Sequence, residues 1–163
     1  MKQRKRVIMK IAVGLALLLL AGCIAAIINA TLAAREPENA LPTIRVDNNG
    51  TPLPADHIRL ASSSWRFLYT VKSDILMEHD TWLDNTTLVP APVIPGAPLE
   101  VHFSYPAEHI KVSRADGDST TFTECSGELV TPLTPDVVYT YRVEAYGGIR
   151  GSRQFYFKIV VRG

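Results

Sequence analysis

The chain has 163 residues, of which 17 are lysine or arginine and 16 are aspartate or glutamate. Five of the cations lie in residues 1–10 and residues 11–34 carry no charge, so residues 35–163 hold 12 cations and 16 anions, a net charge of −4. Because nucleic-acid binding needs a basic surface, this acidic remainder speaks against a nucleic-acid partner. It is long enough for one domain that buries its own core.

The first 34 residues predict a membrane anchor or a lipoprotein signal. The uncharged run from residue 11 to residue 34 is 24 residues long. As a helix it reaches about 36 Å, enough to cross a hydrocarbon core of about 30 Å with some tilt. The five cations that precede it favour a cytoplasmic N-terminus. We therefore expect a single-pass protein of the cell membrane with an extracytoplasmic main domain.

A second interpretation of the same segment rests on Leu20-Ala21-Gly22-Cys23. This stretch resembles the lipobox of bacterial lipoproteins, and the resemblance implies lipidation of Cys23 and cleavage before it. Residues 24–28 remain apolar, whereas lipoproteins usually turn polar after the cysteine. An uncleaved anchor and a lipid anchor on the outer face both stay open, and each tethers the protein to a lipid bilayer.

Residues 35–42 form a linker rich in proline and acidic residues, and short alternating runs follow it. Asn48-Asn49-Gly50 predicts a hairpin turn. Residues 73–83 have some helical character and fit an irregular crossover between sheets. Alternation of apolar and polar residues predicts strands at 43–47, 58–60, 65–71, 99–103, 110–112, 139–145 and 155–161. Together these segments predict an all-β, antiparallel β-sandwich over residues 43–163.

The segment from Leu133 and Pro135 to Tyr139 and Ala145 resembles the L-x-P…Y-x-Y-x-V-x-A pattern of fibronectin type III and related immunoglobulin-like folds. The resemblance makes Tyr139 the candidate for a tyrosine corner, in which a hydroxyl bonds back to upstream backbone. The alternative is that Tyr139 is an ordinary core aromatic. Trp65 is expected to be a second structural aromatic residue.

The order of these features resembles an uncharacterised family of membrane-anchored proteins or lipoproteins of Gram-positive bacilli, with an immunoglobulin or fibronectin III-like ectodomain. The corresponding stretches are residues 61–65, 106–112 and 139–161. Ser64 stands where the family has a cysteine, so a redox or disulfide role at that position is not expected here. The resemblance implies the fold and the location, and it implies no reaction.

Few residues suggest chemistry. His79 and Asp80 belong to a cluster of histidine and carboxylate residues at 78–84. This cluster could form a metal loop or an acid–base pair, and it also fits a solvated loop. No H-x-x-x-H or H-E-x-x-H spacing accompanies it. Residues 116–118 offer oxygen ligands but fit a hairpin turn better. We expect no metal and no cofactor. Cys125 is the only cysteine after the anchor, which excludes an intrachain disulfide there, and we expect it to be buried and inert.

Three functions are compatible with the sequence. The leading hypothesis is a non-catalytic, membrane-tethered, extracytoplasmic immunoglobulin-like module that binds another envelope protein or a cell-wall component. Its recognition loops would lie around Trp82, or around Arg150 and Arg153, whose charges suit an anionic ligand. The second is an accessory or regulatory subunit of an envelope sensing or transport system. The third is an extracytoplasmic hydrolase that uses His79 and Asp80.

Overall fold

The structure is a computed structural model that describes residues 2–35, 41–67, 70–77, 81, 84–104, 107–147 and 151–162. The chain divides into two compact units, Met1–Ala40 and Leu41–Gly163. The first unit holds a helix, and the second holds all the described strands.

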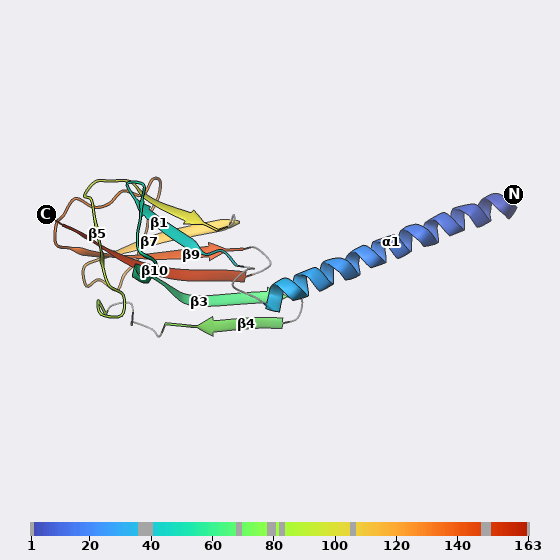
Figure 1. Ribbon diagram of the computed structural model, residues 1–163, viewed down its shortest axis with the longest axis horizontal. Helices are drawn as coiled ribbons and strands as arrows, with labels where there is room; N and C mark the ends of the chain where they lie inside the picture. Colours follow the sequence, from blue (N-terminus) through green and yellow to red (C-terminus); the bar gives the residue numbers. More distant parts are fainter. Residues whose placement is uncertain are drawn as a thin grey trace. The chain divides into compact units, whose positions relative to one another are not determined.

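Helix α1 (Lys2–Arg35) is the described element of the first unit (Figure 1). Its apolar part, Met9–Ile28, has 20 residues whose side chains are exposed. At 1.5 Å per residue this part covers about 30 Å, the thickness of a hydrocarbon core. The expected N-terminal helix, long and apolar enough to span a membrane or to act as a signal, is confirmed. The helix continues without a break through Cys23, which is exposed.

Three antiparallel strands form the smaller sheet of the domain, in the order β2-β1-β6. They are β1 (Ile44–Asn48), β2 (Thr51–Pro52) and β6 (Leu99–Phe103). Asn49 and Gly50 join β1 to β2 with φ angles of 49° and 75°, the left-handed values that a type I′ hairpin requires. The predicted hairpin is therefore confirmed. In β6, Leu99 is buried and His102 is exposed, as the alternation predicted.

The larger sheet has the strand order β4-β3-β10-β9-β7-β8, with every pair along this path antiparallel (Figure 1). A seventh strand, β5 (Ala91–Val93), pairs with the end of β10 in parallel, which the sequence did not predict. The other strands are β3 (Ile58–Phe67), β4 (Thr70–Ile75), β7 (His109–Asp116), β8 (Thr123–Glu124), β9 (Val138–Tyr146) and β10 (Gly151–Val161). A short 3-10 turn, η1 (Ala55–His57), precedes β3.

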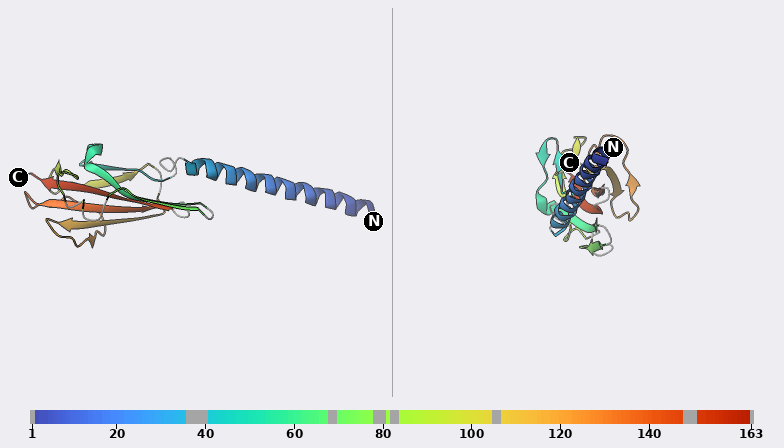
Figure 2. Two further views of the ribbon diagram at one scale, coloured as in Figure 1. Left: turned by 90° about the horizontal axis from the view of Figure 1, so that it is seen from below. Right: turned by 90° about the vertical axis from the view of Figure 1, so that its right-hand side faces the viewer.

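The two sheets pack against each other around one apolar core, as the views along and across the strands show (Figure 2). Val46 and Leu99 from the smaller sheet meet Tyr141 and Phe157 from the larger one. The rings of Tyr141 and Phe157 stack with their centroids 4.9 Å apart and an interplanar angle of 1°. The expected all-β, mainly antiparallel two-sheet structure with one N-terminal apolar helix is thus confirmed at this level.

One strand prediction is wrong in its boundaries. Residues 65–71 were expected to form one strand, but β3 ends at Phe67 and β4 returns antiparallel with Thr70 opposite Phe67. The alternation continues across the reversal, and residues 68–69 contain no glycine, proline, asparagine or aspartate to mark a turn. The crossover expected from residue 73 consequently begins only after Ile75.

The outer face of the larger sheet is also covered. A second buried cluster contains Ala61 on β3, Tyr156 on β10 and Leu88 from the segment before β5. Met77 and Phe122 pack against this cluster. Strand β10 is therefore buried on both faces, including positions that simple alternation assigns to solvent. Because of this double burial, the polar side chain of Lys158 on β10 is only 2% exposed.

Candidate functional site

Two hollows and an exposed apolar patch lie at one end of the domain, which we call the distal end. It is the end where β10 finishes at Val161, whereas Leu41 lies near Gly147 and Gly151 at the other end. The turn after β7 also lies at the distal end, where the Gly117 amide donates a hydrogen bond of 2.8 Å to the Val138 carbonyl. Loops 94–98 and 125–137 complete it.

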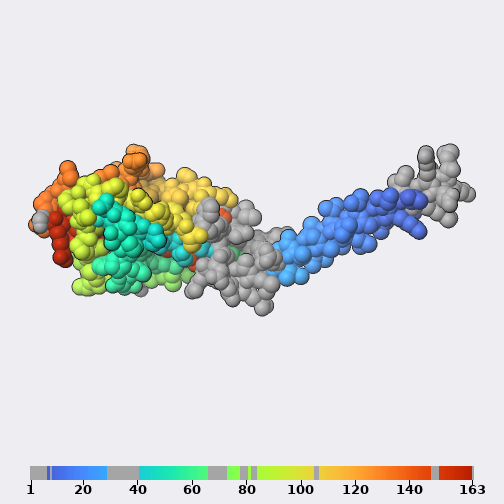
Figure 3. Space-filling model, turned by 45° about the horizontal axis from the view of Figure 1, so that its top comes forward, coloured from blue at the N-terminus to red at the C-terminus, as the bar shows by residue number. Residues whose placement is uncertain are grey.

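The apolar patch consists of Ile94, Val130 and Leu133, which we call the end patch. Their exposures are 54%, 49% and 76%, high values for large aliphatic side chains. Two loops form the patch together, because the Thr131 hydroxyl donates to the Ile94 carbonyl at 2.6 Å and the Gly96 amide donates to the Thr131 carbonyl at 3.2 Å. In Figure 3 the yellow-green segment near residue 94 and the orange segment near residue 133 lie at the same end as the red C-terminal residues.

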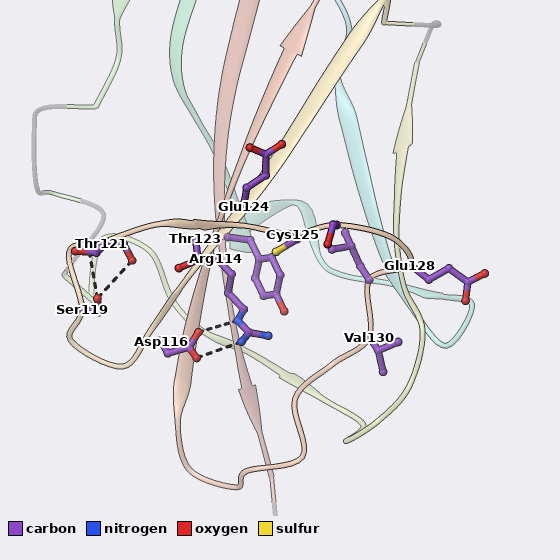
Figure 4. A pocket seen from close by; sticks show the side chains of 12 residues that line it. Arg114, Asp116, Ser119, Thr121, Thr123, Glu124, Cys125, Glu128 and Val130 are labelled. Atoms are coloured by element: carbon purple, nitrogen blue, oxygen red, sulfur yellow. Dashed lines mark hydrogen bonds and ion pairs between the residues drawn. The ribbon is translucent and has the colours of Figure 1, made fainter.

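A polar hollow of about 570 Å³ adjoins the end patch and shares Val130 with it (Figure 4). At its centre, Arg114 on β7 donates from Nε to Asp116 Oδ1 at 2.7 Å and from Nη2 to Asp116 Oδ2 at 3.2 Å. This two-point pairing fixes the guanidinium plane. The lining residues are Arg114, Asp116, Ser119, Thr121, Thr123, Glu124, Cys125, Ser126, Glu128, Leu129, Val130 and Tyr141.

Two ionisable groups of this hollow stay protonated near neutral pH. Burial raises the pKa of Tyr141 to about 12, and the hydrogen bond and charge of Arg114 offset only part of that rise. Burial likewise raises the pKa of the Cys125 thiol, so its nucleophilic thiolate is scarce at neutral pH. Cys125 is half-buried, less than the full burial expected from the sequence.

The rim of the hollow is acidic. Asp116, Glu124 and Glu128 outnumber Arg114 among the charged lining residues. In Figure 4 the carboxylates of Glu124 and Glu128 point away from the guanidinium. Lys111 meets Glu124 at 3.3 Å, an exposed ion pair of small energetic weight. Hydroxyls, carboxylates and an adjacent apolar patch together suit a ligand that carries cationic and apolar groups side by side.

Comparison of the chain with protein-family models, with curated proteins and with solved structures gives no match in any of the three.

The two predicted structural aromatic residues are both buried. Tyr139 is 4% exposed in the core, with the Arg114 guanidinium carbon 5.3 Å from the centre of its ring. Trp65 is 7% exposed and stands opposite Gly151 in the β3–β10 pairing. The tyrosine-corner role of Tyr139 stays a prediction.

Among the predicted binding and catalytic residues, Arg153 is the one that the structure describes. Arg153 is buried, and its Nη1 donates to the Leu41 and Pro42 carbonyls at 3.3 and 3.5 Å. This position ties the start of the domain to β10 and keeps the side chain away from the surface. Trp82 and Arg150, and likewise His79 and Asp80 of the hydrolase hypothesis, lie outside the described residues.

The oxygen-rich stretch of residues 116–118 forms the turn that the sequence favoured. Gly117 has a φ of 59°, and Asp116 is held by Arg114. Within the described ranges, no group of three or more histidine, cysteine, aspartate or glutamate side chains could hold a metal ion.

The sequence offered no signal for the end patch. Ile94 and Leu133 belong to different loops, and only their pairing in space makes the surface. In the sequence, Leu133 belongs to the fold motif that precedes Tyr139.

Proposed function

We propose that this protein is a membrane-tethered, extracytoplasmic, immunoglobulin-like module that binds another envelope protein without catalysing a reaction. The apolar helix supports the tether, whether it stays uncleaved or is replaced by lipid at Cys23. The cations of residues 1–10 support a cytoplasmic N-terminus. The same features support membership of the membrane-anchored family of Gram-positive bacilli that the sequence resembles.

The immunoglobulin-like identity is supported by the last strands. Strands β7, β9 and β10 are consecutive antiparallel neighbours, and β5 joins the far edge of β10 in parallel. Leu133 and Pro135 precede Tyr139 at the spacing of the fibronectin III pattern. The hairpin β3–β4, which pairs with the first part of that same edge of β10, is an addition to that plan.

The end patch is the observation that carries the binding function. A soluble domain of this size has no need to expose Ile94, Val130 and Leu133 together, and exposed apolar patches rimmed by polar residues mark interaction sites. The acidic rim beside the patch favours a partner surface with a basic residue next to an apolar one. Loops at one end of a sandwich are also where such folds place recognition.

Position-dependent cross-linking of the full-length protein in its own membranes tests this function. A photoreactive residue at position 94 is expected to give one defined adduct, and the same residue at position 74 on the exposed edge of β4 is expected to give none. Leu133→Asp is expected to lower the yield of the adduct at position 94 at least about tenfold, because buried apolar contacts at an interface centre carry most of the affinity.

Leu133→Asp is expected to leave the fold intact, because the side chain is 76% exposed. Circular dichroism of the variant provides that control. Equal adducts from positions 94 and 74, or an adduct at position 94 that Leu133→Asp leaves unchanged, would contradict the proposed function.

A further inference from the structure

The second hollow of the distal end, about 430 Å³, contains a buried amine. Lys158 lies on β10 at 2% exposure, where lysine is rare unless its ammonium has close partners. Its Nζ donates to Oδ1 of Asn85 at 2.7 Å. Asn85 belongs to the crossover that leads to β5, and the two residues are 73 positions apart. The lining residues are Asn85, Gly117, Asp118, Asp136, Val137, Val138, Thr140 and Lys158.

The geometry brings an amine and a carboxamide into direct contact. Nζ of Lys158 lies 2.7 Å from Oδ1 of Asn85, the oxygen bonded to Cγ. Holding two such groups together replaces a bimolecular encounter with an intramolecular step, which lowers the barrier to aminolysis of the amide.

Burial also makes the neutral, nucleophilic form of Lys158 more accessible than it is for a free lysine. Burial lowers the pKa of the Lys158 amine, against the opposing charges of Asp84 and Asp118. Asp118 lines the same hollow as Lys158 and Asn85 and can therefore carry protons there. The Asp84 carboxylate accepts bonds from Thr86 and Thr87, which hold the turn that presents Asn85.

We propose that Lys158 and Asn85 form an intramolecular isopeptide bond. Nζ of neutral Lys158 attacks Cγ of Asn85, a new amide bond forms, and the Cγ–Nδ2 bond breaks to release ammonia. The proton that the lysine ammonium first gives up leaves on the ammonia as ammonium, with the Asp118 carboxylate as the carrier in between. Carbon is neither oxidised nor reduced, and no further reactant is needed.

Such a bond fits the construction of the domain. The only cysteine after the helix is Cys125, so no intrachain disulfide can brace it. A bond between residues 85 and 158 closes a long loop, and cross-links across long loops restrict the unfolded chain most. It would also fasten the crossover, which carries Leu88 of the second cluster, to the central strand.

Intact-mass measurement of the purified full-length protein tests the proposal. Wild type is expected to fall short of the mass calculated for its observed N-terminus by one ammonia, and Lys158→Arg and Asn85→Ala are expected to show no deficit. Lys111→Arg, a change at a more exposed lysine, is the matched control and should keep the deficit. N-terminal processing is common to all four proteins and cancels in the comparison.

A proteolytic map of wild type alone provides the second readout, which does not depend on the folding of any variant. It should contain a branched peptide that joins the segments around Asn85 and Lys158. A wild-type protein at its full calculated mass without that peptide would overturn the proposal. So would a deficit that persists in Lys158→Arg, because Asn85 would then have lost ammonia by cyclising on its own backbone.

Discussion

Replacing Gly151 by alanine is expected to destabilise the domain by about 3 kcal/mol or more, because the site combines backbone strain with a steric clash. Gly151 has a φ of 127°, a region that side chains rarely adopt. A Cβ there would overlap the Ser64 carbonyl oxygen and lie 2.9 Å from the Trp65 Cα. The clashing atoms belong to the backbone of the paired strand β3, which cannot move away as a flexible side chain can.

Gly117→Ala is the matched control for this prediction. Gly117 also has a positive φ, 59°, but nothing lies within 4 Å of the position that an alanine methyl group would occupy. Its replacement is expected to cost about 1 kcal/mol, the ordinary penalty for a non-glycine residue in the left-handed region. Denaturant unfolding of residues 41–163, which contain the whole described core, measures both variants. Equal losses at the two glycines would contradict the clash.

Phe157→Ala is expected to lower the free energy of unfolding by about 3–5 kcal/mol, the usual cost of removing a large aromatic side chain from a packed core. Phe157 is fully buried on β10 and stacks on Tyr141. The lost ring leaves a cavity between the two sheets, and the stacking contact disappears with it. Phe157→Leu, which keeps most of the volume, should cost clearly less.

Leu133→Ala provides the contrast on the surface. Its side chain is 76% exposed, so the change should alter stability by about 0.5 kcal/mol or less. The same unfolding experiment measures it. A loss at Leu133 comparable to that at Phe157 would mean that the end patch supports the fold, and it would then be unsuited to a partner.

The sequence predicted the fold best where a strand has one buried face. In β6 and β9 the alternation of aromatic or aliphatic residues with polar ones matches the burial along most of each strand. The Asn49-Gly50 turn was predicted equally well, because its backbone needs residues that tolerate a positive φ. Residues close together in the sequence determine these strands and this turn, so a short sequence pattern predicts them.

Long-range contacts account for what the sequence did not predict. Strand β5 has three residues, too few for a period, and it exists because β10 offers it a free edge. Lys158 occupies a position that alternation gives to solvent, yet the crossover covers it. The end patch depends on two loops that meet only in the folded domain. None of these three features has a signature within a window of ten residues.

The proposed function depends most on display of the domain outside the cytoplasm on a membrane tether. Labelling of Asp56→Cys in intact cells with a membrane-impermeant maleimide tests this display, because Asp56 lies on the exposed turn η1. We expect the variant to be labelled without permeabilisation, more strongly than wild type with its half-buried Cys125, and to stay with the membranes after alkaline extraction. Labelling that requires permeabilised cells would place the domain inside the cytoplasm and rule out the proposed function.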